Sequence, residues 1–375
     1  MFANPKKIGI LEIKNRFVRS ATYEGLAAEN GEITDKLISF YKKLSEGGTG
    51  LIITSYAFIQ QSGRANNKQI GVYKDDFIPG LRRLAAIIHE HGEGCKVALQ
   101  LVHAGRQSHH VKETTAPSAI LEKFTNKMPR EMTKDEIEGT IENFAQAVRR
   151  AKEAGFDGVQ LHGAHGYLIS EFLSPYTNRR TDQYGGNTEN RLRFVKQIYK
   201  RSRELVGVDF PIMIKVNCDD FLEGGITLEE SKKITKMLSK IGYDAIEISS
   251  CMWETVKRKK GEIGWKPTFI PESRMSVGKI NEPAYHLAYA KEIKKDIDIP
   301  LILVGGVNSI DLVEEILNKG DADFVSFSRP LIREPDLPNR WMKGIGSSIV
   351  DCDYCNNCLM TLAKTGLFCP KKEES

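Results

Sequence analysis

The sequence predicts a single (β/α)8 barrel of the TIM type, with long βα loops and a cysteine-rich C-terminal tail. Eight short runs rich in Val, Ile and Leu lack polar alternation, which is typical of parallel strands covered on both faces. Helix-like segments lie between them, and no change of composition marks a linker. A doubly wound sheet is the alternative, because parallel strands alone do not distinguish the two folds. We place the barrel at residues 1–340 and the tail at residues 341–375.

The predicted strands cover residues 17–21, 50–54, 96–101, 158–162, 212–216, 245–249, 301–304 and 324–328. Predicted helices begin after Thr34, Thr133, Thr227 and Asn308 or Ser309, and end near Gly47, Gly155, Gly242 and Gly320. Thr133 with Glu136 has the spacing of a capping box, and Thr227 with Glu230 repeats it. The connections at 103–132 and 250–283 are longer than ordinary βα loops, and we interpret them as lids or specificity loops. The second of them contains Trp253, Trp265 and Phe269.

The composition is that of an ordinary globular protein, with 41% hydrophobic and 27% charged residues in 375. A net charge of +5, from 54 basic and 49 acidic residues, does not indicate a nucleic-acid partner. The basic run at residues 257–260 is interpreted as a solvated loop, with docking of a phosphorylated ligand as the alternative. No apolar run reaches the ~18 residues of a membrane span. The N-terminus lacks the apolar segment of a secretory signal, so we expect a cytoplasmic protein.

The stretch at residues 158–186 contains the densest group of candidate catalytic side chains. His162, His165 and Tyr167 follow a short buried strand within six positions. Two imidazoles and a phenol at one strand end offer several donors, although such histidines are also found as satisfied structural groups.

Polar residues or glycines recur at the predicted strand ends: Thr22, Ser55, Gln100, His162, Lys215, Ser249, Gly305-Gly306 and Ser328-Arg329. Gly305 and Gly306 expose backbone N–H groups before a helix, and Arg329 can bind an anion, which together predict a phosphate site. Gln100 offers a donor and an acceptor to a heterocycle carrying an amide. Lys215 supplies a positive charge that could stabilise a reduced ring. The alternative for Lys215 is an ion pair with Asp219 or Asp220.

The tail holds Cys352, Cys355, Cys358 and Cys369, crowded into the end of the chain. A cytoplasmic protein does not normally form disulfides, and four thiolates at this spacing suit an iron–sulfur cluster or a tetrahedral zinc. Cys95, Cys218 and Cys251 are scattered, and we expect them to be small buried side chains.

The chain resembles the Old Yellow Enzyme-like NADH:flavin oxidoreductases, and within them the flavin half of bacterial 2,4-dienoyl-CoA reductase. The most specific stretch is HGAHGYLISEFLSPYTNRRTDQYGGNTENRLRF, residues 162–194. ALQLVHAGR at residues 98–106 and APSAI at residues 116–120 match as well. The resemblance covers nearly the whole chain, from residue 14 to the cysteine tail.

The resemblance implies non-covalent FMN at the mouth of the barrel. Gln100 would contact the flavin edge, and Lys215 would lie near N1 and O2, where the family more often has Arg. Ala21 and Thr22, in place of a common Pro-Met or Pro-Leu pair, would lie against the flavin. Tyr23 stands where some bacterial members carry a redox-tuning Cys. The residues implied for the phosphate are Gly305, Gly306, Ser328 and Arg329.

The implied activity is reduction of an activated C=C bond in an enone, enal, enoate or quinone, with NAD(P)H as hydride donor. His162 and His165 would bind the carbonyl oxygen of this small unsaturated substrate, and Tyr167 would donate a proton. A flavin-dependent demethylase or lyase, and a flavin/iron–sulfur electron-transfer subunit, are the alternatives. The sequence does not determine whether NADH or NADPH is the hydride donor. It also does not determine the number of subunits, and a homo-oligomer is one of the alternatives.

In the dienoyl-CoA reductase relatives a comparable tail ligates a [4Fe–4S] cluster, with a middle spacing one residue longer. Those relatives carry a further domain that binds FAD and NADPH, whereas the sequence here ends at Ser375. A cluster at the four cysteines would therefore need a separate electron-donor protein. Zinc and reduced thiols are the alternatives.

Overall fold

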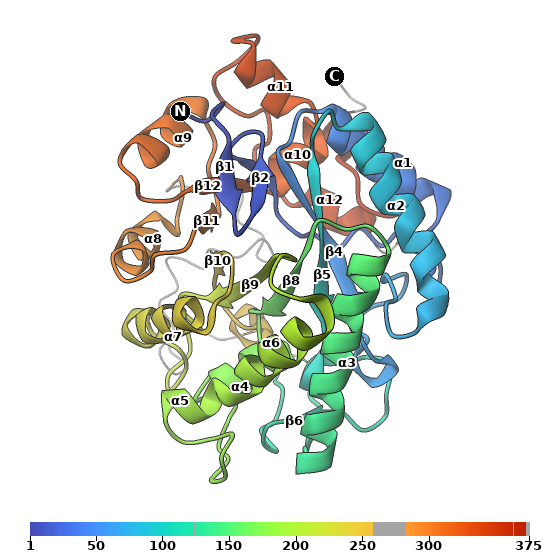
Figure 1. Cartoon of the computed structure of the whole chain (residues 1–375), viewed down its shortest axis with the longest axis vertical. Helices are drawn as coiled ribbons and strands as arrows, with labels where there is room; N and C mark the ends of the chain where they lie inside the picture. The colour runs from blue at the N-terminus through green and yellow to red at the C-terminus, as the bar shows by residue number, and fades with distance from the viewer. Residues whose placement is uncertain (124, 258–282, 363, 373–375) are drawn as a thin grey trace.

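A computed structural model describes residues 1–375 apart from 124, 258–282, 363 and 373–375. Eight parallel strands close into a barrel in the order β10-β11-β12-β3-β4-β5-β8-β9 (Figure 1). They are β3 (Phe17–Arg19), β4 (Leu51–Phe58), β5 (Lys96–Val102), β8 (Gly158–Gly163), β9 (Ile212–Asn217), β10 (Ile246–Ser249), β11 (Leu301–Val304) and β12 (Phe324–Phe327). Each predicted strand overlaps one of them. The predicted (β/α)8 barrel is confirmed.

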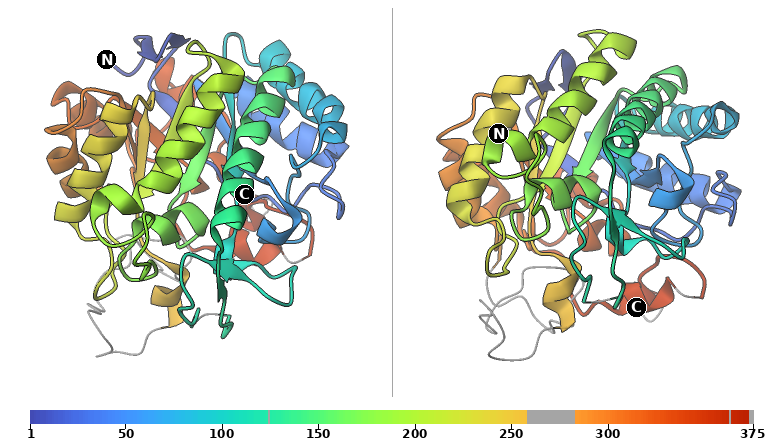
Figure 2. Two further views of the ribbon diagram at one scale, coloured as in Figure 1. Left: turned by 60° about the horizontal axis from the view of Figure 1, so that its bottom comes forward. Right: turned by 90° about the horizontal axis from the view of Figure 1, so that it is seen from below.

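Helices surround the barrel on the outside (Figures 1 and 2). The longer ones are α1 (Asp35–Glu46), α2 (Ile78–His91), α3 (Lys134–Glu153), α6 (Arg193–Val206), α7 (Leu228–Ile241), α8 (Leu287–Lys294) and α9 (Ile310–Asn318). The shorter ones are α4 (Leu168–Leu173), α5 (Thr188–Arg191), α10 (Arg329–Arg333), α11 (Leu337–Met342) and α12 (Asn357–Thr361). None of the helices in the described part of the chain is long and apolar enough to cross a membrane.

The predicted helix starts are confirmed at α1, α3, α7 and α9. Thr34, Thr133, Thr227 and Ser309 each accept a hydrogen bond from a backbone N–H in the first turn. Both halves of the capping box form at α3. At α7 the carboxylate of Glu230 instead accepts from Thr188 and pairs with Arg191. The predicted second capping box is therefore only half formed, because α5 competes for the glutamate.

The barrel interior is apolar at one end and polar at the other. An antiparallel hairpin, β1 (Lys6–Ile8) and β2 (Leu11–Ile13), places Ile8 and Ile13 against the interior cluster. That cluster includes Val18, Leu51 and Phe324, all without solvent exposure. Apolar packing therefore closes the amino-terminal end of the strands, and the polar strand ends lie at the other end.

The long first loop and the tail lie at the carboxyl end of the strands. The loop carries β6 (Thr115–Ala116) and β7 (Arg130–Glu131), which pair in parallel. Figure 2 shows the region of β6 and the helix α12 at the same end of the molecule. Trp265, Phe269 and most of the basic run fall outside the described residues.

Candidate active site

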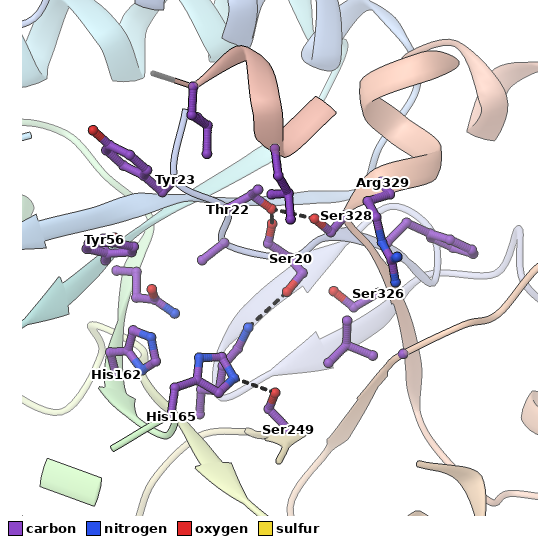
Figure 3. A pocket seen from close by; sticks show the side chains of 18 of the residues that line it. Ser20, Thr22, Tyr23, Tyr56, His162, His165, Ser249, Ser326, Ser328 and Arg329 are labelled. Atoms are coloured by element: carbon purple, nitrogen blue, oxygen red, sulfur yellow. Dashed lines mark hydrogen bonds between the residues drawn. The ribbon is translucent and has the colours of Figure 1, made fainter. Parts of the chain in front are cut away.

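A cavity of about 810 Å³ opens at the carboxyl ends of the barrel strands. Its volume is in the range of ligand sites. Every strand of the barrel, or the residue after it, contributes to its wall: Ser20, Tyr56, Gln100, His162, Lys215, Ser249, Val304 and Ser326. Figure 3 shows aromatic and imidazole side chains on one side of the cavity, and Ser326, Ser328 and Arg329 on the other.

The structure brings together the residues predicted for the flavin and the substrate, with one exception among the predicted strand ends. Ala21, Thr22, Gln100, His162, His165, Tyr167, Lys215, Ser249, Gly305, Gly306, Ser328 and Arg329 all line the cavity. Ser55, predicted as a strand end, is not among the lining residues; its N–H donates to the Tyr41 hydroxyl on α1. A register shift in β4 between Ile53 and Tyr56 turns the chain, so Tyr56 lines the cavity instead.

His162 and His165 lie with their ring centroids 5.0 Å apart. His162 belongs to β8, and its Nδ1 accepts the N–H of Ala164 over 3.4 Å. This bond assigns the proton of a neutral imidazole to Nε2. His165 has a left-handed backbone (φ 65°), and its N–H donates to Asn217 Oδ1. Its Nε2 lies 2.7 Å from the Ser249 hydroxyl, so both rings are fixed in orientation.

Tyr167 lies at the start of α4 with only 3% of its surface exposed. Its ring centroid is 4.8 Å from that of His162, with the planes nearly perpendicular. The phenol and the two imidazoles therefore form one cluster facing the cavity. The sequence placed these three side chains within six positions of one another, and the structure brings their rings into contact.

Two further tyrosines, Tyr56 and Tyr23, extend this cluster. Tyr56 was missed from the sequence, whereas the resemblance places Tyr23 where some bacterial members carry a redox-tuning Cys. Tyr56 packs 5.8 Å from Tyr167 and 5.7 Å from Tyr23, measured between ring centroids. Burial, and then the neighbouring Tyr167, raises the pKa of Tyr56 well above its usual range. Burial raises the pKa of Tyr23 to about 12. Both phenols therefore remain neutral donors at physiological pH, and the cavity wall on this side is aromatic.

A hydrogen-bonded network of five side chains crosses the floor of the cavity. Gln100 donates to Gln160 over 2.7 Å, and Gln160 donates to Glu247 over 2.8 Å. Lys215 Nζ lies 3.1 Å from Glu247 Oε2 and donates to Ser20 over 2.9 Å. Ser20 in turn donates to Glu247 over 2.8 Å. Buried polar groups are stable when they are paired in this way.

The ion pair expected as an alternative for Lys215 therefore forms with a different residue. Asp220 accepts hydrogen bonds from Ser174, Asn217 and the N–H of Ile226. Asp219 accepts from the N–H of Phe221. Lys215 pairs with Glu247 because these two residues face each other in register on adjacent strands.

The opposite side of the cavity has the donors of an anion site. Gly305 and Gly306 both have positive φ, 122° and 75°, which only glycine adopts readily. A Cβ at Gly305 would lie 2.4 Å from the Tyr285 ring. The hydroxyl of Ser326 is buried, lines the cavity and has no hydrogen-bond partner among the residues that the structure describes. A bound phosphate would supply that partner, and the positively charged Arg329 lies beside it.

The four tail cysteines line a second, small cavity of about 20 Å³ together with Arg329 and Arg333. Arg333 Nη1 donates to the Cys369 sulfur over 3.8 Å. Burial raises the pKa of Cys352 to about 12. Among the described residues, no three His, Cys, Asp or Glu side chains are gathered closely enough to hold a metal ion. The four cysteines share one small cavity without the close grouping of a metal centre, so the metal site predicted at Cys352, Cys355, Cys358 and Cys369 stays a prediction. Cys95, Cys218 and Cys251 are buried, as predicted.

Comparison with known proteins shows one family across the barrel. Residues 1–347 match the NADH:flavin oxidoreductase / NADH oxidase family. The chain is 39% identical over 355 residues to an NADH oxidase of Thermoanaerobacter brockii, covering 93% of this chain and 52% of the oxidase. It therefore spans about half the length of that relative. It is 37% identical over 351 residues to an NADPH dehydrogenase of Geobacillus sp., covering 93% of this chain and 96% of the dehydrogenase.

Solved structures show the same similarity. A 2-naphthoyl-CoA reductase in complex with 2-naphthoyl-CoA has a TM-score of 0.86 at 30% identity, over 95% of this chain and 54% of the reductase. A histamine dehydrogenase from Rhizobium sp. 4-9 has a TM-score of 0.80 at 28% identity, over 92% of this chain and 48% of the dehydrogenase. An old yellow enzyme homologue from Zymomonas mobilis has a TM-score of 0.76 at 25% identity, over 99% of this chain and 98% of the homologue.

Proposed function

The chain belongs to the NADH:flavin oxidoreductase / NADH oxidase family, and we propose that it reduces an activated C=C bond with hydride from NAD(P)H and FMN as cofactor. One observation carries the proposal: His162, His165 and Tyr167 face the same cavity as the phosphate donors around Arg329. A hydride acceptor held by the first group would lie within one enclosed space with a flavin held by the second.

The residues of the cavity suit FMN. Gly305, Gly306, Ser326, Ser328 and Arg329 would hold the phosphate through backbone N–H groups, hydroxyls and one guanidinium. Across the floor, Gln100 and Lys215 would contact the polar ring edge, and Ala21 and Thr22 would lie against the ring. When bound, FMN accepts hydride from the nicotinamide and passes it to the substrate carbon.

The protein's own groups would handle the charge and the proton. As hydride reaches the β-carbon, negative charge develops on the carbonyl oxygen of the substrate. The Nε2–H of His162 opposes that charge together with His165, whose ring is held by Ser249. Tyr167 then gives its phenolic proton to the α-carbon, so that one hydride and one proton add across the double bond. A phenol is a weak acid, so close contact is required.

Steady-state turnover tests this proposal. Protein loaded with FMN should oxidise NADH or NADPH under anaerobic conditions only when 2-cyclohexen-1-one or a related enone is added. The saturated ketone should form in a one-to-one ratio to the oxidised nicotinamide. Full flavin loading without any ketone formation from enones, enoates or quinones would contradict the proposal.

A second candidate, oxidation of an amine as in a demethylase, is favoured by the aromatic wall. The ring centroid of Tyr56 lies 5.7 Å from that of Tyr23 and 5.8 Å from that of Tyr167, and such rings attract a ligand cation. The similarity to histamine dehydrogenase supports the same reading. Anaerobic mixing separates the two, because a methylated amine would bleach the flavin directly, whereas an ene-reductase is bleached by NAD(P)H.

The electron-transfer alternative depends on the tail. Arg329 lines both the large cavity and the small cavity with the four cysteines, so a redox group there would lie next to the flavin site. Anaerobic purification with iron, sulfide and zinc analysis decides this. About four irons and four sulfides per chain would support a [4Fe–4S] cluster and a separate electron donor. Zinc would support a structural role for the tail. If neither iron nor zinc is found, the four cysteines are reduced thiols.

A further inference from the structure

Glu247 is a buried carboxylate that the proposed reaction does not use. It lies in the middle of β10 with no solvent exposure. In the barrel it faces Lys215 in register across the β9–β10 pair. Neighbouring residues in register point to the same side of a sheet, so both side chains enter the barrel interior. Lys215 and Ser20 line the cavity, and Glu247 contacts both of them.

Both oxygens of Glu247 have partners within the barrel. Oε1 accepts from Ser20, and Oε2 accepts from Gln160 and lies 3.1 Å from Lys215 Nζ. Lys215 is 97% buried, because only 3% of its surface is exposed. Charges in such an environment interact strongly, since little water screens them. The carboxylate therefore offsets much of the positive field that Lys215 would otherwise project into the cavity.

Glu247 also determines the orientation of two amides. A carboxylate only accepts hydrogen bonds, so Gln160 must present its NH2 group to Glu247. Its carbonyl oxygen then faces Gln100, and the Gln100 NH2 group donates to it. Gln100 itself lines the cavity, and its carbonyl oxygen takes no part in this chain of hydrogen bonds. Hydrogen bonds therefore run in one direction across three strands, from Gln100 on β5 to Gln160 on β8 to Glu247 on β10.

We infer that Glu247 is a positioning residue that sets the charge and the hydrogen-bond polarity of the cavity floor. The inference rests on the proposed placement of FMN, with its polar ring edge against Gln100 and Lys215. Two-electron reduction places negative charge at that edge of a flavin. Lys215 stabilises this charge and Glu247 weakens the stabilisation. Glu247 therefore lowers the reduction potential of the bound flavin and makes it a stronger hydride donor.

Glu247→Gln tests the inference, because the amide keeps the shape and removes the charge. The midpoint potential of bound FMN, measured anaerobically by dye equilibration, should become more positive than in the parent. Sulfite, which binds flavins more tightly when positive charge lies near this edge, should bind at least about tenfold more tightly, or about 1.4 kcal/mol. Asp323→Asn is the matched control. Asp323 is a buried carboxylate paired with Lys6 and Lys294 at the amino-terminal end of β12, and its loss should change neither value.

Lys215→Met and the double variant Lys215→Met/Glu247→Gln complete a double-mutant cycle. Lys215→Met should lower the potential, and adding Glu247→Gln should raise it again toward the parent. If Glu247→Gln alone does not fold, the comparison of Lys215→Met with the double variant tests the role of Glu247. The inference is overturned if Glu247→Gln changes the potential and the sulfite affinity in neither background. Failure of the parent to bind FMN would overturn the proposed function as well, so the two failures are distinguishable.

Discussion

Arg329 Nη1 donates to Asn356 Oδ1 over 2.8 Å, and this bond connects the end of the last barrel strand to the cysteine-rich tail. The guanidinium also lies 4.7 Å from the centroid of the Tyr354 ring. Tyr354 is itself fixed, because its hydroxyl donates to the carbonyl of Val307. The tail therefore holds the one arginine that the proposed phosphate site depends on, and it contributes directly to the cavity wall.

Arg329→Ala should weaken FMN binding by about tenfold to a hundredfold, since a charge-assisted hydrogen bond to phosphate is lost. Asn356→Ala should weaken it less, because the charge remains while its position is no longer fixed. The FMN dissociation constant, followed by quenching of flavin fluorescence, measures both effects. Arg340→Ala is the control, as Arg340 pairs with Glu334 and Asp336 outside the cavity. Undiminished affinity in Arg329→Ala would contradict the phosphate assignment.

Tyr167→Phe should leave reduction of the flavin by NAD(P)H intact and slow the reduction of an enone by about 10²-fold or more. The ring and its packing against His162 remain, and only the proton is lost. Stopped-flow measurement of the two half-reactions separates these effects. Tyr184→Phe serves as the control, because the Tyr184 hydroxyl bonds Gln197 outside the cavity. Equal enone rates in Tyr167→Phe and the parent would remove Tyr167 from the mechanism.

His162→Ala should lower kcat/KM for the enone by about 10²–10³-fold, the usual effect of removing one donor to a developing oxyanion. The buried ring offers its Nε2–H to the cavity, since Nδ1 already accepts from Ala164. His89→Ala is the matched control, because His89 is exposed and pairs with Asp157 near the amino-terminal ends of the strands. Enone kinetics at saturating NAD(P)H give the comparison. An unchanged kcat/KM would mean that another group binds the carbonyl oxygen.

The strands of the barrel could be predicted because each is a local run of apolar residues with parallel neighbours on both sides. Most strand ends followed from these runs, including those that carry His162, Lys215 and Arg329, but the end of β4 did not. Tyr56 could not be found, because a bulge in β4 changes which side chain faces the cavity and leaves no clear mark in the sequence. The contribution of Tyr354 depends on how the tail folds back, which is set by contacts far apart in the chain.

The position of Glu247 in the sequence already indicates a buried carboxylate. It stands between two isoleucines in a strand predicted to be buried, and Gln160 stands likewise between Val159 and Leu161. A buried carboxylate requires a partner, so its presence there predicts an interior cation. Only the register of β9 and β10 identifies that cation as Lys215.

The stability of the fold should fall as the pH decreases from about 6.5 to about 4. Burial lowers the pKa of both His103 and His286 to about 4, against about 6.5 in an unfolded chain. The unfolded state therefore binds more protons in this window, and each histidine favours unfolding as the pH falls. Burial, and then the nearby positive charge of Lys215, lower the pKa of His286, whereas its hydrogen bond with the Val304 carbonyl opposes this shift.

Replacement of His286 by Gln should reduce this pH dependence. Between pH 7 and pH 5, the variant should lose about 2 kcal/mol less unfolding free energy than the parent, which is the contribution of one such histidine. Urea unfolding at both pH values and one FMN concentration measures the difference. His103 should continue to contribute in both proteins. An equal loss in His286→Gln and the parent would mean that the His286 imidazole does not titrate on unfolding in this range, and the acid sensitivity would then have to come from other groups.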